Sequence, residues 1–175
     1  MSTRIILVRA VNVGGATLPM AQFRAMLTEL GATEVRTYIA SGNAVVDLEG
    51  DPVAFDRAVE AAIHDRFGFS REVISRTPAQ LRESLEGHPF EVVDAARSYI
   101  TFLSATPESN TVDAAADLPT GADRWALSGR ELHLCFADGM GRATLNLDRL
   151  LKTLGVAGTA RNLRTVQALI DLTDR

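Results

Sequence analysis

Apolar residues in the first half of the chain follow two spacings, one typical of strands and one typical of helices. The run at positions 5–10 is almost entirely apolar, as in a central strand buried on both faces. Apolar residues at helical spacing follow Pro19 and end before Gly31, and a second such series follows Asp51. The pattern predicts strands at 5–10, 35–39, 44–48 and 71–76, and helices at 19–30, 52–67 and 78–85.

The rest of the chain repeats this order of elements. It predicts strands at 99–103, 124–127, 131–137 and 157–160, and helices at 107–116, 144–154 and 163–172. Each half is then the split β-α-β arrangement of ferredoxin-like folds, with an extra helix. We therefore expect an α+β protein in which two ferredoxin-like halves, 1–87 and 97–175, pack together and are joined by a connection at 88–96.

Polar side chains and glycines gather where these strands end. In the first half, the end of strand 1 and the turn between strands 2 and 3 share one rim, because the crossover connection is right-handed. That rim would hold Arg9, Asn12, Gly14, Gly15, Ser41 and Asn43. In the second half, the ends of strands 3 and 4 share a rim that would hold Gly139, Gly141, Arg142, Arg161 and Asn162. These residues are the candidate ligand-binding groups.

Each candidate also has a structural interpretation. Glycines at 14 and 15 suit a tight turn with positive φ, or a cradle of backbone amides for an anion. Arg9 is the only charge in its strand and either pairs with a carboxylate or faces a ligand. The 139–142 segment precedes an expected helix start, where Arg142 could hold an anion. Arg161 could instead pair with Asp138 or Asp148.

Several of these segments resemble a bacterial family known as domain of unknown function 1697. The matching segments are 9–15, 19–20, 37–43, 89–90, 139–142, 159–162 and 165–166. The resemblance implies a duplicated ferredoxin-like core, but the family has no assigned activity. The chain departs from the family at Ala10, where glycine is usual, and at 143–145, which reads Ala-Thr-Leu where Ser-Lys-Leu is usual.

Composition excludes some classes of function. The net charge of −4 argues against binding of duplex DNA by bulk charge. Among 18 Lys and Arg residues only Lys152 is a lysine, and its place in the last turn of a helix argues against lysine chemistry. The single Cys135 allows no intrachain disulfide, which favours a reducing compartment. No segment has the length of a membrane span, so we expect a cytoplasmic protein.

No complete catalytic motif accompanies these features. His133 and Cys135 share one face of a strand, as a thiol nucleophile and its base would, although buried residues of a sheet have the same spacing. Aromatic residues on the second-half strands alternate between faces, which favours core packing over base stacking. No residue spacing indicates a metal site, and no cofactor is expected.

The leading hypothesis is a binding protein for a small anionic metabolite, using both rims across the cleft between the halves. The alternatives are a protein or nucleic-acid interaction module, or an enzyme without lysine or metal chemistry.

Overall fold

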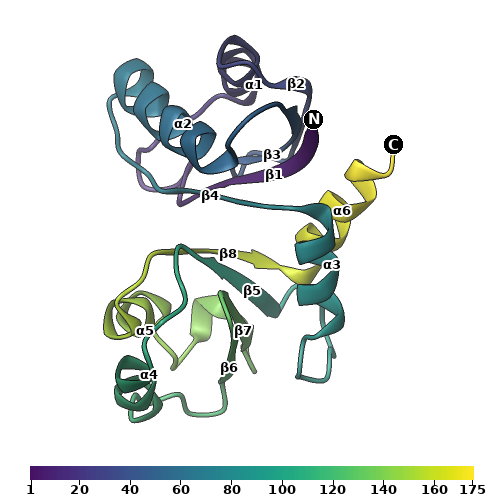
Figure 1. The fold of residues 1–175 in the computed structure, drawn as a ribbon. Helices are drawn as coiled ribbons and strands as arrows, with labels where there is room; N and C mark the ends of the chain where they lie inside the picture. Colours follow the sequence, from purple (N-terminus) through teal and green to yellow (C-terminus); the bar gives the residue numbers. More distant parts are fainter. The chain divides into compact units, whose positions relative to one another are not determined.

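The computed structural model describes residues 1–175 and divides into two compact units (Figure 1). Unit 1 comprises Met1–Glu83 and Gln167–Arg175, and unit 2 comprises Ser84–Val166. The chain therefore passes from one unit to the other inside helices, at α3 (Pro78–Glu86) and at α6 (Leu163–Thr173), and not in the segment 88–96.

The last residues of the chain group with unit 1, whereas the sequence pattern placed them in the second half. Two polar contacts join these residues to unit 1. Arg36 donates a hydrogen bond of 2.7 Å to the carbonyl of Leu172, and Arg82 forms an ion pair of 2.6 Å with Asp174. Hydrophobic spacing alone carries no information about such contacts, because they join residues far apart in the chain.

Unit 1 is an α+β fold with the ferredoxin-like order of strands. Its elements are β1 (Ser2–Val8), α1 (Met20–Glu29), β2 (Thr33–Tyr38), β3 (Asn43–Leu48), α2 (Pro52–Phe67), β4 (Val73–Arg76) and the first part of α3. The strand order is β2-β3-β1-β4, and every pair is antiparallel. The expected central strand is present, with Ile5, Ile6, Leu7 and Val8 all fully buried. It spans Ser2–Val8 and not 5–10, so it contains Arg4, and Arg9 lies beyond its end.

Unit 2 repeats this architecture. Its elements are β5 (Ser98–Leu103), α4 (Ser109–Ala116), β6 (Arg124–Ser128), β7 (Glu131–Cys135), α5 (Leu147–Leu154) and β8 (Gly158–Asn162), followed by the start of α6. The strand order β6-β7-β5-β8 is the same as in unit 1. The duplicated ferredoxin-like fold expected from the sequence is therefore present.

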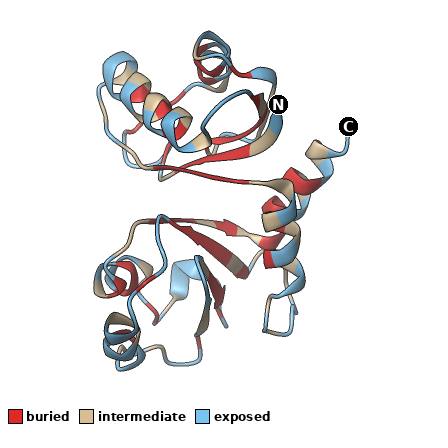
Figure 2. Cartoon of the chain, in the orientation of Figure 1, coloured by how far each residue is buried: buried red, intermediate tan, exposed pale blue.

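In each unit, two helices cover one face of the sheet, and buried residues lie both on the strands and on the helices that cover them (Figure 2). In unit 1, Phe23 of α1 and Ile63 of α2 pack against a sheet face that includes Ile6 and Val46. In unit 2, α4 and α5 cover the sheet face that carries Leu132 and Leu134. Burial of these side chains is the main favourable term in the folding of each unit, at about 25 cal/mol per Å² of apolar surface.

Local sequence signals explain where α2 begins and ends. Asp51 accepts hydrogen bonds from the amides of Val53 and Ala54, as expected for an N-cap. The helix ends at Gly68, whose φ of 77° is the left-handed conformation that glycine adopts readily. None of the helices is both long enough and apolar enough to cross a bilayer.

Candidate functional site

The structure brings the two segments of the first rim together. Val8 at the end of β1 donates to the carbonyl of Gly42, in the turn between β2 and β3. The side chain of Asn12 donates to the carbonyls of Ala40 and Leu18 and accepts from the amide of Leu18 at 2.8 Å. Asn12 therefore joins its own loop to the β2–β3 turn, which is a structural use of its amide group.

The Ser41-Gly42-Asn43 turn is also held by its own contacts. Asn43 is fully buried, and its Nδ2 donates to Ser41 Oγ at 2.7 Å and to the carbonyl of Tyr38 at 3.2 Å. A Cβ at position 42 would lie 2.7 Å from Val11 Cγ2, so only glycine allows the two loops to approach this closely. Glycines 14 and 15 lie in an exposed part of the same loop, with φ values of 58° and 89°.

Ala10 adopts a backbone conformation that disfavours alanine. Its φ is 47°, in the left-handed region, and the residue is exposed. Left-handed backbone costs an L-residue about 1–2 kcal/mol, which glycine avoids. Glycine would adopt this conformation at position 10 without that cost.

Replacing Ala10 with glycine is expected to stabilise the protein by about 0.5–1 kcal/mol, since relief of the strained φ exceeds the extra entropy of glycine in the unfolded chain. The midpoint of thermal unfolding should rise by about 2 °C. Ala25→Gly is the matched control, because Ala25 is exposed in the middle of α1. That change should lower stability by about 1 kcal/mol. Equal destabilisation by both substitutions would contradict the assigned strain at Ala10.

A pocket of about 490 Å³ lies beside this rim in unit 1. We call it the Arg71 pocket. Its lining comes from α2 and from the segment that leads into β4, and comprises Arg57, Glu60, Ala61, His64, Ser70, Arg71 and Glu72. Because β1 and β4 are antiparallel neighbours with Val8 opposite Val73, the start of β4 lies beside Arg9 and Ala10.

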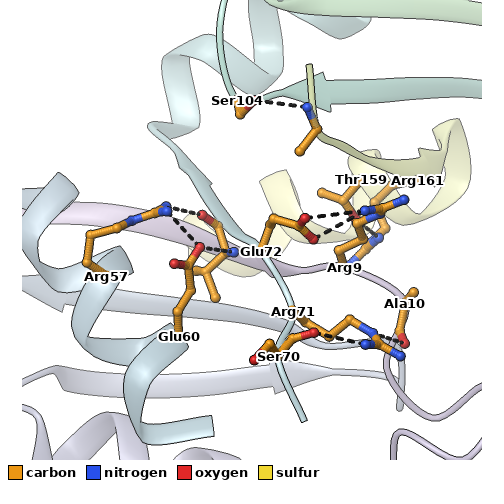
Figure 3. A network of polar contacts seen from close by, with 12 residues as sticks. Arg9, Ala10, Arg57, Glu60, Ser70, Arg71, Glu72, Ser104, Thr159 and Arg161 are labelled. Atoms are coloured by element: carbon orange, nitrogen blue, oxygen red, sulfur yellow. Dashed lines mark hydrogen bonds and ion pairs between the residues drawn. The ribbon is translucent and has the colours of Figure 1, made fainter. Parts of the chain in front are cut away.

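Two carboxylates of the Arg71 pocket already have cationic partners (Figure 3). Glu60 pairs with Arg57 at 2.8 Å, and these side chains also bond the amide and the carbonyl of Val73 on the edge strand β4. Glu72 pairs with Arg9 at 3.3 Å, so Arg9 has the carboxylate partner that one of the two sequence interpretations required.

Arg71 is the arginine of this pocket without a carboxylate partner. Its Nε and Nη1 donate to the backbone carbonyls of Ala10 and Ser70, at 3.3 and 2.9 Å (Figure 3). The guanidinium also lies 5.5 Å from the centre of the Phe69 ring. These contacts fix the orientation of the guanidinium but leave its positive charge unneutralised and its Nη2 available to a ligand.

The Arg71 pocket also contains a serine and a histidine in contact. Ser70 Oγ lies 3.2 Å from His64 Nδ1, and both residues are exposed. No third group orients the imidazole, so the pair lacks the arrangement that activates a serine nucleophile. The hydroxyl and the imidazole are therefore best described as hydrogen-bonding groups of the pocket.

Nowhere in the structure do three His, Cys, Asp or Glu side chains gather in a way that could hold a metal ion.

The second rim is organised by a residue that the sequence analysis did not single out. Asp123 is buried, and its carboxylate accepts hydrogen bonds from the amides of Ala137, Thr144 and Leu145 at 2.8–3.0 Å. These amides are therefore not available to an external anion. Helix α5 begins only at Leu147 and is capped by Asn146, so the helix expected from position 144 starts later.

The candidate residues of this rim have different roles. Gly139 and Gly141 flank a single 3₁₀ turn, and Arg142 is exposed at the end of that turn. Asn162 accepts from the amide of Thr165 and so caps the start of α6.

Arg161 is 7 % exposed and donates to Thr159 Oγ1 and to the carbonyl of Ala160 (Figure 3). Burial lowers the pKa of Arg161 to about 10, which still leaves it charged at neutral pH.

His133 has a partner that its sequence neighbours did not suggest. Its Nδ1 lies 2.9 Å from Nδ1 of His88, and the two rings are in contact. The pKa of His133 falls to about 4, first because the ring is buried and second because of repulsion from His88. Burial also lowers the pKa of His88. Both imidazoles are therefore neutral at pH 7, and one donates a hydrogen bond to the other. This pair accounts for His133 without a catalytic role for Cys135.

Sequence reasoning missed the residues of the Arg71 pocket, although a signal for them was present. The expected topology already placed the start of strand 4 beside the end of strand 1. The same argument that joined Arg9 to Ser41 would therefore have joined Arg9 to Ser70-Arg71-Glu72. In contrast, the contacts of Asp123 and the His88–His133 pair join residues far apart in sequence and have no motif that reveals them.

Comparison with known proteins places this chain in a family. Residues 1–133 match the family described as "Protein of unknown function (DUF1697)", so the segments at 139–142 and 159–162 lie beyond the matched range. A solved structure, conserved bacterial protein SP0830 from Streptococcus pneumoniae, aligns over 100 % of this chain and 99 % of its own, with a TM-score of 0.75 and 21 % identity. This similarity shows a shared fold.

Other comparisons add no information about function. A structure described as a "putative glycine cleavage system transcriptional repressor" has a TM-score of 0.25 and 10 % identity, over 91 % of this chain and 95 % of its own, and supports no conclusion. No curated protein matches the sequence. The match over residues 1–133 covers most of the chain, and the protein therefore belongs to the DUF1697 family of proteins of unknown function.

Proposed function

We propose that this protein binds a small anionic metabolite in the Arg71 pocket of unit 1. The observation that carries the proposal is the unneutralised guanidinium of Arg71, which two backbone carbonyls hold in place at the pocket. The pairs Arg57–Glu60 and Arg9–Glu72 cancel their own charges, which leaves one net positive charge for a ligand. The volume of about 490 Å³ lies within the range of pockets that bind small molecules.

The polar groups around Arg71 suit an oxyanion. Nη2 of Arg71 can donate to a phosphate or carboxylate oxygen, and the hydroxyl of Ser70 and the imidazole of His64 provide further hydrogen bonds. Of the residues expected from the sequence, Arg9 pairs with Glu72 of this pocket. Asn12, Ser41 and Asn43 hold the loop after β1 and the β2–β3 turn together. Binding of the anion at the second rim is not part of this proposal, because Asp123 already occupies the amides there.

The proposal is tested by calorimetric titration with inorganic phosphate, sugar phosphates and dicarboxylic acids. At least one of these anions should bind, and Arg71→Gln should weaken its binding about tenfold by removing a charge-assisted hydrogen bond. Arg66→Gln is the matched control, because Arg66 is also a surface arginine of unit 1 but pairs with Glu29 outside the pocket. Absence of binding across the panel, or equal affinity in Arg71→Gln, would contradict the proposal.

A further inference from the structure

Unit 2 contains a separate pocket of about 250 Å³, which has not yet been given a role. We call it the Trp125 pocket. Its apolar wall includes the indole of Trp125 on β6, Leu118 after α4 and Leu150 of α5. The volume equals that of about eight molecules of liquid water. It is below the usual range for drug-sized ligands, so a ligand of this pocket has room for a single ring.

Contacts outside the pocket hold the side that carries Thr144 and Leu145 in place. Thr144 and Leu145 both line the pocket, and the buried carboxylate of Asp123 fixes their amides. Gly121 packs against Thr144 so closely that an added Cβ would lie 2.9 Å from Thr144 Oγ1. The wall is therefore formed before any ligand arrives, which lowers the entropy lost on binding.

One cation lines the Trp125 pocket, and its charge is unpaired. Arg149, in the first turn of α5, uses its backbone amide for the cap by Asn146, but no carboxylate pairs with its guanidinium. Asn146 accepts through Oδ1, which leaves Nδ2 as a donor, and the Thr144 hydroxyl lines the same pocket. The lining of the pocket therefore combines one aromatic side chain with one cationic and two neutral hydrogen-bonding groups.

We propose that the Trp125 pocket is a second binding site, which takes a single-ring aromatic carboxylic acid. The ring of the ligand packs against the indole, in the offset or edge-to-face arrangement that aromatic pairs prefer. Its carboxylate accepts two hydrogen bonds from the Arg149 guanidinium, the geometry in which arginine binds carboxylates most strongly. A purely aliphatic acid would lose the contact with the indole, and a neutral aromatic amide would lose the ion pair.

The single tryptophan of the chain lies in this pocket, so its fluorescence reports occupancy directly. Benzoate is the probe, titrated to about 10 mM, tenfold above the millimolar dissociation constant expected for so small a ligand. We expect a saturable change in Trp125 emission with benzoate, and binding about tenfold weaker with benzamide. This comparison uses the unmodified protein and does not depend on the folding of a variant.

Arg149→Gln should weaken benzoate about tenfold and leave benzamide unchanged. Lys152→Gln is the matched control, because Lys152 is exposed on the same helix but does not line the pocket. No saturable change with benzoate, equal binding of benzoate and benzamide, or equal benzoate affinity in Arg149→Gln and the unmodified protein would each overturn the proposal. None of these outcomes bears on the Arg71 pocket, which lies in unit 1.

Discussion

Replacing Asp123 with alanine is expected to lower the stability of unit 2 by about 3–6 kcal/mol. The substitution removes the acceptor of three backbone amides, those of Ala137, Thr144 and Leu145. Each buried donor left without a partner costs about 1–3 kcal/mol. The hydrogen bonds to Ala137 and Thr144 are only part-buried, so these two donors contribute near the low end of that range. Urea unfolding followed by the fluorescence of Trp125, which lies in unit 2, measures the effect.

Two variants separate this effect from a general loss of charge. Asp123→Asn keeps one oxygen, which can still accept from Thr144 and Leu145, and we expect about half of the loss. Asp138→Ala removes an exposed carboxylate from the same loop and should change stability by less than about 0.5 kcal/mol. If Asp123→Ala unfolds at the same urea concentration as Asp138→Ala, then Asp123 does not organise this loop.

Acidification is expected to destabilise unit 2 through the His88–His133 pair. In the unfolded chain a histidine takes up its proton near pH 6.5, whereas in the fold His133 does so only near pH 4. The unfolded state therefore binds more protons between these values. The contribution of His133 is complete above about pH 6.5 and is lost as the pH falls towards 4. Its size is about 3 kcal/mol, and the lowered pKa of His88 acts in the same direction.

The comparison of His133→Leu with the unmodified protein isolates this effect from the titration of carboxylates. Urea unfolding between about pH 7 and pH 4 should show the unmodified protein losing about 3 kcal/mol more than the variant. The two proteins are compared by how much their free energy of unfolding changes between about pH 7 and pH 4. Its value at a single pH is not used, because His133→Leu also removes the hydrogen bond to His88 and so lowers stability at neutral pH. The same pH dependence in both proteins would show that His133 is not held neutral by the fold.

The fold could be predicted because its signals are local. The apolar run at Ile5–Val8 gave a central strand, Asp51 and Pro52 gave the start of α2, and Lys152 before Gly155 gave the end of α5. Strand order then followed from the right-handed crossover. Each of these signals involves residues close in sequence, and each agrees with the observed element.

The candidate site could be predicted only in part, because side-chain partners are not local. Arg9 lies directly after β1, as expected, but its partner Glu72 is 63 residues away. The expected anion cradle near Thr144 is instead filled by the carboxylate of Asp123, which comes from the segment before β6. A glycine-rich loop before a helix has the same sequence whether its amides bind a ligand or a side chain of the protein.

Titration of the isotopically labelled protein with inorganic phosphate, followed by amide NMR spectra, tests the central claim most directly. Binding in the Arg71 pocket predicts saturable shifts at the amides of Ser70, Arg71 and Glu72, and their loss in Arg71→Gln. The amides of Thr144 and Leu145 should not respond, since they are bonded to Asp123. Shifts confined to 144–145, or shifts at 70–72 that persist in Arg71→Gln, would contradict an anion site built around Arg71.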